Sequence, residues 1–340
     1  MSKISRRTAR GEGDMIIAGD IGGTKSLLRM EDDSGSAILE RRYENGDFEE
    51  FPAVLAAFLG ECRASRGAAS TLDCACFGVA GPVVDGHAEL TNRPWRIDAV
   101  ELARVFGIGR VRVVNDFVAA AHGVEALEPA QFVTLQEGTP LRDGPRVIIG
   151  AGTGLGIAHL VVRDAGKLVI SSEAGHAGFA PRDELQMALW QALHAASGRV
   201  EVEDVVSGRG ISFIDRFLRQ RDAVRSGRET SDSVEARDPA SIAAAAESGT
   251  DPLAMEAIDV FLGAFGAVAG DHALAMTARG GVYVAGGIAP KLLWRIRSGG
   301  FLRAFNDRGP FAALTRSFPV HVVQEERLGL LGCLGLARSD

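Results

Sequence analysis

The chain has 340 residues, 46% of them hydrophobic and 24% charged, and these ordinary proportions exclude a disordered or collagen-like protein. Its length favours about two domains and a sizeable core. Acidic residues outnumber basic ones by 44 to 37, giving a net charge of −7, which argues against a nucleic-acid partner. The four cysteines are scattered, as suits a reducing compartment, and we expect a cytoplasmic protein.

No membrane-spanning segment is predicted from the apolar stretches of the chain. The most apolar stretch, residues 260–270, is closed off by Asp259 and by Asp271-His272, well short of the ~20 residues that a span requires. Residues 1–14 are basic but lack the apolar stretch of a signal peptide, so we interpret them as a flexible leader.

The first half of the chain begins with closely spaced apolar runs. Such runs predict strands, and apolar residues at helical spacing predict helices. The predicted elements are a strand at 15–18 entering a glycine-rich turn at 19–24, strands at 26–30 and 37–43, a helix over 48–66, a strand at 72–79, a helix over 98–106, a strand at 111–114 and a helix from Asn115-Asp116 through Ala126. The short spacing of the first three strands predicts an antiparallel start to the sheet.

The second half repeats this beginning and then becomes largely helical. The predicted elements are strands at 146–150, 156–162 and 167–170, helices from 182 onward, a long buried helix over 252–276, strands at 281–285 and 320–323, and a last helix from 328. The polar, charge-mixed segment 220–238 is interpreted as a mobile surface connection.

A strand that runs into a glycine-rich turn occurs twice, at 15–24 and at 146–154. This repetition predicts two related α/β halves with a cleft between them, the kind of place where small molecules bind. We expect a small α/β domain over residues 15–125, completed by about 320–340, and a large α/β domain over 126–319.

The two glycine-rich turns match neither of the common phosphate-binding motifs. In the first turn Thr24 precedes Lys25-Ser26, where a P-loop requires glycine. In the second turn Leu155 falls where a dinucleotide fingerprint needs its third glycine. Both turns therefore have to be interpreted from their own residues.

Each turn offers donors to an anion. Backbone N–H groups at Gly22 and Gly23 can approach a phosphate closely, and the hydroxyl of Thr24 adds a donor. Asp20 could hold a hydrated Mg²⁺ beside the phosphates. The turn Gly152-Thr153-Gly154 offers the same groups in the second half. The alternative is that both are simply tight hairpin turns.

Seven segments in collinear order resemble bacterial glucokinases. They are GDIGGT at 19–24, FGVAGPVVDGHAELTNRPW at 77–95, VNDF at 114–117, GAGTGLGIAHL at 150–160, SEAGHAGFAP at 172–181, VSGRG at 206–210 and AGGIAP at 285–290. The resemblance implies the two-lobed, actin/hexokinase-like (ribonuclease H-like) α/β fold with an ATP cleft, a homodimer, and Mg²⁺- and ATP-dependent phosphorylation of glucose to glucose 6-phosphate. Residues 177–210 contain no cysteine, which disfavours the related sugar kinases that carry a zinc motif.

The resemblance assigns nucleotide-binding residues to three segments. They are Gly19, Asp20, Ile21, Gly22, Gly23 and Thr24; Gly152, Thr153 and Gly154; and Gly286 and Gly287. The last pair resembles the adenosine-binding segment of the superfamily, and a simple strand-to-helix turn is the alternative. A site for a protein-bound transition metal is not expected, because no HExxH or CxxC spacing occurs.

Asp116 is the candidate general base. It follows the apolar strand at 111–114 and opens a helix, so that its carboxylate could accept the proton of an attacking sugar hydroxyl. Position alone favours an ordinary helix N-cap instead. The resemblance places the catalytic aspartate of the family on this residue.

A hexose presents a ring of hydroxyls and needs several convergent polar side chains. The resemblance assigns glucose contacts to Asn115, Asp116, Glu173, His176 and Glu203, and places Asn92 on a substrate-facing loop. By residue type alone, a Glu or His in a loop, such as Glu173 or His176, is more often a solvated surface group. Lys25, Ala174, Gly178 and Arg209 depart from the family pattern, which puts the exact sugar preference in doubt.

Three other functions compete with glucose phosphorylation. A kinase for mannose, fructose or an N-acetylhexosamine would use the same reaction. A sugar-sensing regulator would need a DNA-binding helix-turn-helix, which about 14 residues before the first strand cannot supply, and the acidic balance argues the same way. A nucleotide-driven assembly or chaperone module would have no use for the predicted sugar-binding residues.

Overall fold

The computed structural model describes residues 15–66, 71–90, 93–164, 166–227 and 235–339, which form two compact units. Unit 1 comprises the described residues up to Leu127 and from Arg327 onward, and unit 2 comprises Glu128–Glu326. The predicted leader, residues 1–14, lies outside the described residues.

Unit 1 is built on a five-stranded sheet. In spatial order its strands are β3 (Ala37–Glu44), β2 (Lys25–Glu31), β1 (Met15–Ile21), β4 (Leu72–Val79) and β8 (Arg110–Asn115). The predicted antiparallel start is confirmed, because β1 pairs antiparallel with β2, and β2 with β3. The strands β4 and β8 are parallel to β1 and to each other, so the carboxyl ends of all three lie at one edge.

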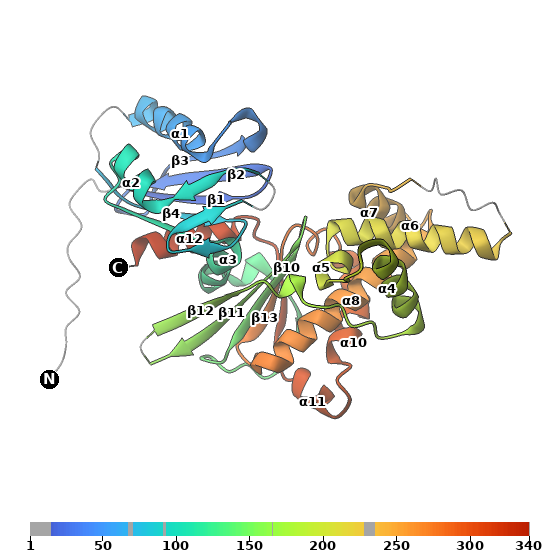
Figure 1. Cartoon of the computed structure of the whole chain (residues 1–340). Helices are drawn as coiled ribbons and strands as arrows, with labels where there is room; N and C mark the ends of the chain where they lie inside the picture. The colour runs from blue at the N-terminus through green and yellow to red at the C-terminus, as the bar shows by residue number, and fades with distance from the viewer. Residues whose placement is uncertain (1–14, 67–70, 91–92, 165, 228–234, 340) are drawn as a thin grey trace. The chain divides into compact units, whose positions relative to one another are not determined.

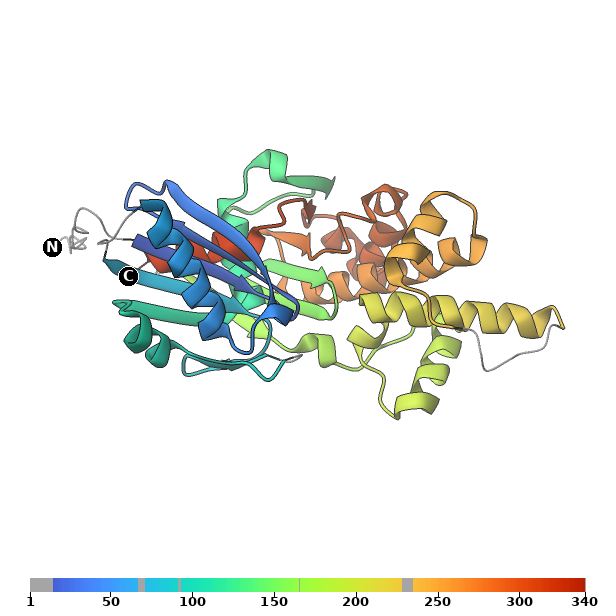
Figure 2. The same ribbon diagram turned by 90° about the horizontal axis from the view of Figure 1, so that it is seen from above.

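Helices cover both faces of this sheet (Figure 1). α1 (Phe51–Arg66) and α2 (Ala99–Phe106) pack on one face against residues such as Ile17 and Phe77. Figure 2 shows α1 lying across that face. On the other face α3 (Asp116–Gly123) and α12 (Leu328–Arg338) pack against Ile16, Cys74 and Cys76. Successive side chains of a strand point to opposite faces of the sheet, so residues on both faces are buried, Cys74 and Cys76 among them.

The connections of unit 1 contain short elements that the apolar pattern did not predict. They are η1 (Asn45–Asp47) and a small sheet of β5 (Val83–Val84), β6 (His87–Glu89) and β7 (Arg96–Asp98). The helix predicted through Ala126 is confirmed, with its last turn, η2 (Val124–Ala126), in the 3-10 form.

Unit 2 contains a six-stranded sheet whose first five strands repeat the order of unit 1. In spatial order they are β12 (Gly166–Ser172), β11 (Leu155–Arg163), β10 (Arg146–Ala151), β13 (Gly281–Ala285), β14 (Val320–Val323) and β9 (Phe132–Gln136). In each unit three antiparallel strands are followed by two parallel ones, as expected for related halves. Because β14 belongs to this sheet, the chain returns to unit 1 at Arg327 rather than at about residue 320.

Helices make up most of the rest of unit 2. They are α4 (Glu184–Ser197), α5 (Val202–Val205), α6 (Gly208–Arg225), α7 (Pro239–Glu247), α8 (Pro252–Met276), α9 (Leu293–Ile296), α10 (Gly300–Asn306) and α11 (Ala312–Thr315), with the 3-10 turns η3 (Pro129–Gln131), η4 (Ala174–His176) and η5 (Gly309–Phe311). Within the described residues, α8 is the one helix long and apolar enough to cross a membrane, and most of it is buried in the core of unit 2.

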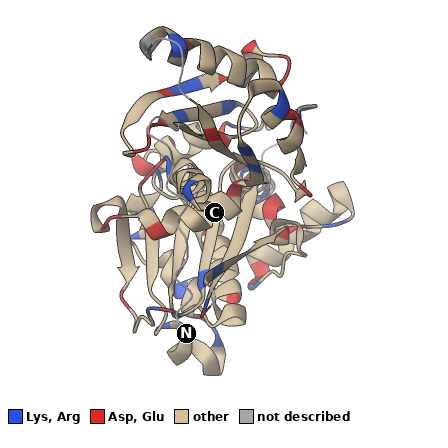
Figure 3. Ribbon diagram, turned by 90° about the vertical axis from the view of Figure 1, so that its left-hand side faces the viewer, with Lys and Arg blue, Asp and Glu red and all other residues tan. Residues whose placement is uncertain are grey.

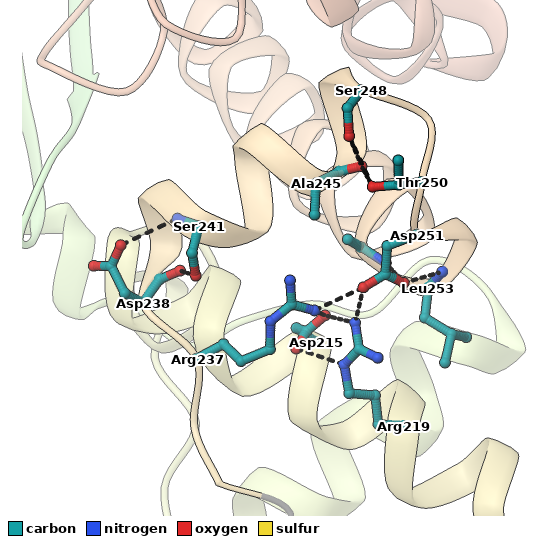
Figure 4. A network of polar contacts seen from close by, with 11 residues as sticks. Asp215, Arg219, Arg237, Asp238, Ser241, Ala245, Ser248, Thr250, Asp251 and Leu253 are labelled. Atoms are coloured by element: carbon teal, nitrogen blue, oxygen red, sulfur yellow. Dashed lines mark hydrogen bonds and ion pairs between the residues drawn. The ribbon is translucent and has the colours of Figure 1, made fainter.

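Charged residues of both signs are interspersed over both units (Figure 3). One network in unit 2 is largely shielded from water (Figure 4): Asp215 of α6 and Asp251, the N-cap of α8, share Arg219 and Arg237. The prediction that residues 220–238 form a mobile surface connection is therefore partly wrong. α6 continues to Arg225, Arg237 is held by two aspartates, and residues 228–234 lie outside the described part.

Candidate active site

The first glycine-rich turn connects β1 and β2 as a hairpin. The strand β1 runs to Ile21, further than predicted, so that Gly19, Asp20 and Ile21 lie within the sheet and Gly22, Gly23 and Thr24 alone form the turn. Gly22 closes it by donating its N–H to the carbonyl of Lys25 at 2.9 Å. A Cβ at Gly19 would lie 2.6 Å from Leu28 and 2.7 Å from Phe77, so packing within the sheet accounts for that glycine.

Asp20 lies at the beginning of helix α12. A Cβ on Gly329, in the first turn of this helix, would lie 2.8 Å from Asp20 Oδ2. Burial raises the pKa of Asp20 to about 6, and the charge of Arg42 opposes this rise. A cation beside Asp20 would favour its ionised form, so the carboxylate fits the role of holding Mg²⁺ through water.

Asn115 and Asp116 mark the junction between β8 and α3. The N-cap of α3 is Asn115, whose Oδ1 accepts the N–H groups of Phe117 at 2.9 Å and Val118 at 3.3 Å. Its Nδ2 donates to the carbonyl of Gly81 at 3.1 Å. Position alone favoured Asp116 as the cap, and that reading is wrong: Asp116 is the first residue of the helix, at the edge where the parallel strands end.

In unit 2 the second glycine-rich turn is also a hairpin, between β10 and β11. Gly152 donates to the carbonyl of Gly154 at 2.8 Å and accepts the N–H of Gly208 at 2.9 Å, which joins the turn to the start of α6. Gly286 adopts a φ of +81°, and a Cβ there would lie 2.5 Å from the carbonyl oxygen of Ala151. The structure therefore brings the predicted Gly152–Gly154 and Gly286-Gly287 segments together.

Glu173 is the N-cap of the short turn η4, and His176 is its last residue. This turn lies directly against the start of β11. A Cβ on Gly175 would lie 2.4 Å from the carbonyl oxygen of Leu155, so only glycine permits this approach. After the turn, Gly178 forms a bridge with Glu201, and the Val202 N–H donates to Ala177 at 2.9 Å. This pairing places η4 beside α5, the helix that carries Glu203.

His176 is bonded to a residue that the sequence patterns did not single out. Its Nδ1 lies 2.7 Å from Glu201 Oε2. The hydrogen bond with Glu201 is the largest cause that raises the pKa of His176, burial opposes it, and the charges of Glu203, Glu201 and Glu173 add to the rise. Arg199 bonds to Glu201 at 3.1 Å and to the carbonyl of His176 at 2.8 Å.

Glu203 connects this group to the glycine turn. Its Oε2 accepts the N–H of Leu155 at 2.8 Å, and its Oε1 lies 3.3 Å from Arg209 Nη2. Arg209, one of the departures from the family pattern, also reaches Asp204 at 3.3 Å. Glu203 therefore keeps one oxygen for the backbone of the turn and presents the other beside a cation.

The predicted residues thus form one group in each unit. Asp20, Gly22–Thr24, Asn115 and Asp116 belong to unit 1, and the second glycine turn, Glu173, His176 and Glu203 belong to unit 2. Asn92 lies outside the described residues. Within the described residues, no cluster of three or more His, Cys, Asp or Glu side chains suited to a metal ion is found.

Proteins of known family match the chain over nearly its full length. A family model described as glucokinase matches residues 17–339. A glucokinase from Nostoc sp. is 40% identical over 337 residues, covering 94% of this chain and 97% of the relative. A crystal structure of glucokinase from an Antarctic psychrotroph matches with a TM-score of 0.80 and 27% identity, over 96% of this chain and 99% of that chain. The structure of Balamuthia mandrillaris glucokinase in complex with glucose matches with a TM-score of 0.78 and 21% identity, over 96% and 94%.

Proposed function

Because the chain belongs to the glucokinase family, whose members phosphorylate glucose, we propose that it transfers a phosphoryl group from ATP to the 6-hydroxyl of D-glucose with Asp116 as the general base. The predicted hexokinase-like α/β fold is confirmed by the structural match. The observation that supports Asp116 as the base is its position: it is the first residue of α3, directly after the parallel strand β8, and Asn115 is the N-cap. The Asp116 carboxylate accepts the N–H of Phe117 through Oδ1 at 2.9 Å, a contact that fixes its position at the end of the strand.

The proton and electron movements are simple. As the sugar oxygen bonds to the γ-phosphorus, its proton passes to the carboxylate of Asp116, while the bond between the γ-phosphorus and the bridging oxygen breaks and ADP leaves with the electron pair. General base catalysis of this kind typically contributes about 10²–10⁴-fold to the rate. Asp116 therefore has to lie within hydrogen-bond reach of the 6-hydroxyl when glucose is bound.

We propose that the glucose hydroxyls are bound by Asn92, Asn115, Asp116, Glu173, His176 and Glu203. Carboxylates accept hydroxyl protons, and a protonated imidazole or an amide N–H donates to hydroxyl oxygens. The hydrogen bonds of Asn115 and Glu203 to backbone groups hold these two side chains in fixed positions, which reduces the entropy lost on binding.

We propose that the nucleotide is held by the segments 19–24, 152–154 and 286–287. Two observations support the fit of MgATP. The turn Gly22–Thr24 presents backbone N–H groups to an anion. Burial disfavours the ionised form of the partly buried Asp20 carboxylate, and a nearby cation would stabilise that form. The bound Mg²⁺ supplies charge neutralisation on the phosphates.

The substrate is tested by ADP release from purified protein with MgATP and a panel of glucose, mannose, fructose and N-acetylglucosamine. We expect glucose to give the highest kcat/KM and a product that glucose-6-phosphate dehydrogenase oxidises. A higher kcat/KM for another sugar would assign a different hexose kinase, and ADP release independent of any sugar would refute the proposal.

We propose further that the enzyme acts in the cytoplasm as a homodimer. All four cysteines are free and buried, which suits a reducing compartment. Light scattering coupled to size-exclusion chromatography tests the dimer: a mass of one chain at micromolar concentration would contradict it.

A further inference from the structure

Every carbonyl oxygen of the turn Gly22–Thr24 is bound by a donor from outside the hairpin. The Gly22 oxygen accepts Asn45 Nδ2 at 2.8 Å, and the Thr24 oxygen accepts the backbone N–H of Asn45 at 2.8 Å. Between them, the Gly23 oxygen accepts Arg93 Nε at 3.1 Å. Two residues, one from η1 and one from the segment before β7, thus hold three consecutive carbonyls.

The orientation of these carbonyls fixes the orientation of the amides. In a planar trans peptide the C=O and the following N–H point in opposite directions. Holding the Gly22 and Gly23 oxygens toward Asn45 and Arg93 therefore directs the N–H groups of Gly23 and Thr24 away from them. Within the described part of the chain, neither N–H has a protein acceptor. Consecutive N–H groups directed to one side form the type of concavity that binds anions.

Both holding residues are themselves fixed. Asn45 is fully buried, and its Oδ1 accepts a hydrogen bond of 2.7 Å from the hydroxyl of Ser26, which is also fully buried. The guanidinium of Arg93 lies 5.2 Å from the ring centroid of Trp95, a side chain that is 1% exposed. Neither can release the turn without breaking other contacts, so the turn keeps its shape before any ligand arrives.

We infer that Asn45 and Arg93 are positioning residues for the nucleotide: they hold the Gly22–Thr24 turn so that its free N–H groups face the phosphates. This inference rests on the proposed function, because it requires that the turn binds phosphate. A purely structural role, in which Asn45 and Arg93 only join the hairpin to its neighbours, would affect stability and leave the nucleotide and the sugar equally bound.

The test compares Arg93→Met with Arg96→Met. Methionine keeps most of the side-chain length of arginine and has no hydrogen-bond donor. Arg96, the first residue of β7, is the control because its side chain is 84% exposed and pairs with Glu89. We expect Arg93→Met to raise the KM for MgATP and the Kd for MgADP, measured by calorimetry, about fivefold to tenfold, the effect of one lost hydrogen bond. The KM for glucose and kcat should change less than twofold, and Arg96→Met should match wild type in all four.

Two further variants separate charge from geometry. Arg93→Lys keeps the cation and lacks the Nε donor, so recovery of wild-type binding in this variant would overturn the inference and assign a purely electrostatic role. Asn45→Asp keeps the acceptor for Ser26 and places a carboxylate against the Gly22 oxygen, so MgADP binding should weaken at least tenfold. The thermal midpoint of each variant identifies any that fails to fold.

The outcomes distinguish this inference from the proposed function. Wild-type MgADP affinity in both Arg93→Met and Asn45→Asp would overturn the inference, and so would an equal loss of glucose and nucleotide affinity with a lower thermal midpoint. Wild-type protein that binds MgADP but releases no glucose-dependent ADP would refute the proposed function alone.

Discussion

At the scale of single residues, the protonation state of His176 depends on Glu201, a residue that has no direct role in the proposed chemistry. Glu201 accepts a hydrogen bond from Nδ1, so the neutral ring presents Nε2 as an acceptor and the protonated ring presents it as a donor. Because Glu201 raises the pKa of His176 above its usual 6.5, the ring stays protonated to a higher pH. The pair therefore stabilises the fold at acidic pH, and this contribution is lost as the pH rises through the pKa of His176.

Replacing Glu201 by glutamine should lower the pKa of His176, because the largest cause of its rise is removed. The titration of the His176 ring protons by NMR measures this directly. The KM for glucose should begin to change at a lower pH in the variant. The control is Glu184→Gln, which removes an exposed carboxylate of the same unit and should leave both the His176 titration and the pH dependence of this KM unchanged. An unaltered His176 titration in Glu201→Gln would contradict this account of the pair.

At the scale of elements, the position of Asp116 depends on how closely α3 packs against α12. A Cβ on Gly332 of α12 would lie 1.7 Å from the carbonyl oxygen of Ala119 in α3, a distance that no rotamer change can relieve. Further along, a Cβ on Gly123 would lie 2.1 Å from the carbonyl oxygen of Leu328. These two glycines allow the helices to touch along their backbones and thereby hold the start of α3.

Gly332→Ala should therefore destabilise the protein by about 1–3 kcal/mol or more, as overpacking does, and lower kcat by displacing Asp116. Gly335→Ala is the matched control, because a Cβ there would meet nothing within 4 Å. Alanine should stabilise that exposed helical position by up to about 1 kcal/mol. Urea unfolding measures both, and equal stability of the two variants would show that the helices do not pack in this way.

The arginine–aspartate network of unit 2 should govern stability in acid. Burial raises the pKa of Asp251, but hydrogen bonds from Arg219, the Ala254 N–H and Arg237 outweigh it and lower this pKa to about 2. Because the folded pKa lies below the usual 3.8, the contribution is present above pH 4 and is lost as the pH falls toward 2.

Asp251→Asn should remove that acid dependence and cost about 1–3 kcal/mol at pH 7, because asparagine still caps α8 but no longer pairs with the two arginines. Asp238→Asn changes the N-cap of α7 in the same way without breaking an arginine pair, and should lower the free energy of unfolding only slightly. Urea unfolding at pH 3 and pH 7 gives the free energy of unfolding of each variant. The account fails if the two variants unfold at the same urea concentration at pH 7.

At the scale of the whole molecule, the two units differ in how the chain builds them. Unit 2 is formed by one continuous segment, 128–326, whereas unit 1 needs α12 from the far end of the chain. Without α12, Ile16, Cys74 and Cys76 would be exposed to water on one face of the sheet.

We expect residues 128–326 to unfold cooperatively in urea as a separate fragment. Residues 15–127 should stay unfolded until a peptide of residues 327–340 is added. Cooperative unfolding of 15–127 alone, followed by circular dichroism, would contradict this view.

The sequence predicted the apolar elements well because burial on both faces leaves a strong pattern. Strands such as β4 and β13 and helix α8 have the predicted bounds. β9 was missed because it is a half-buried edge strand of mixed polarity, and β5 to β7 because strands of two or three residues carry no periodicity.

Polar positioning residues were also missed, for a different reason. Asn45 is 19 residues from its partner Ser26, and Glu201 is 25 residues from His176. Both are polar residues in loop-like segments, where side-chain type says nothing about a distant partner. Even the cap of α3 fell one residue from its expected place, because Asn and Asp are nearly equal as N-caps and the two stand side by side.

The central claim is that the Asp116 carboxylate removes the proton of the attacking sugar hydroxyl, and single-turnover ADP formation with saturating glucose and MgATP tests it most directly. Asp116→Asn should lower this rate by about two orders of magnitude or more while glucose still binds. Glu101→Gln, which removes a first-turn carboxylate from α2 in the same unit, should leave the rate unchanged. A single-turnover rate in Asp116→Asn within tenfold of wild type would contradict the claim.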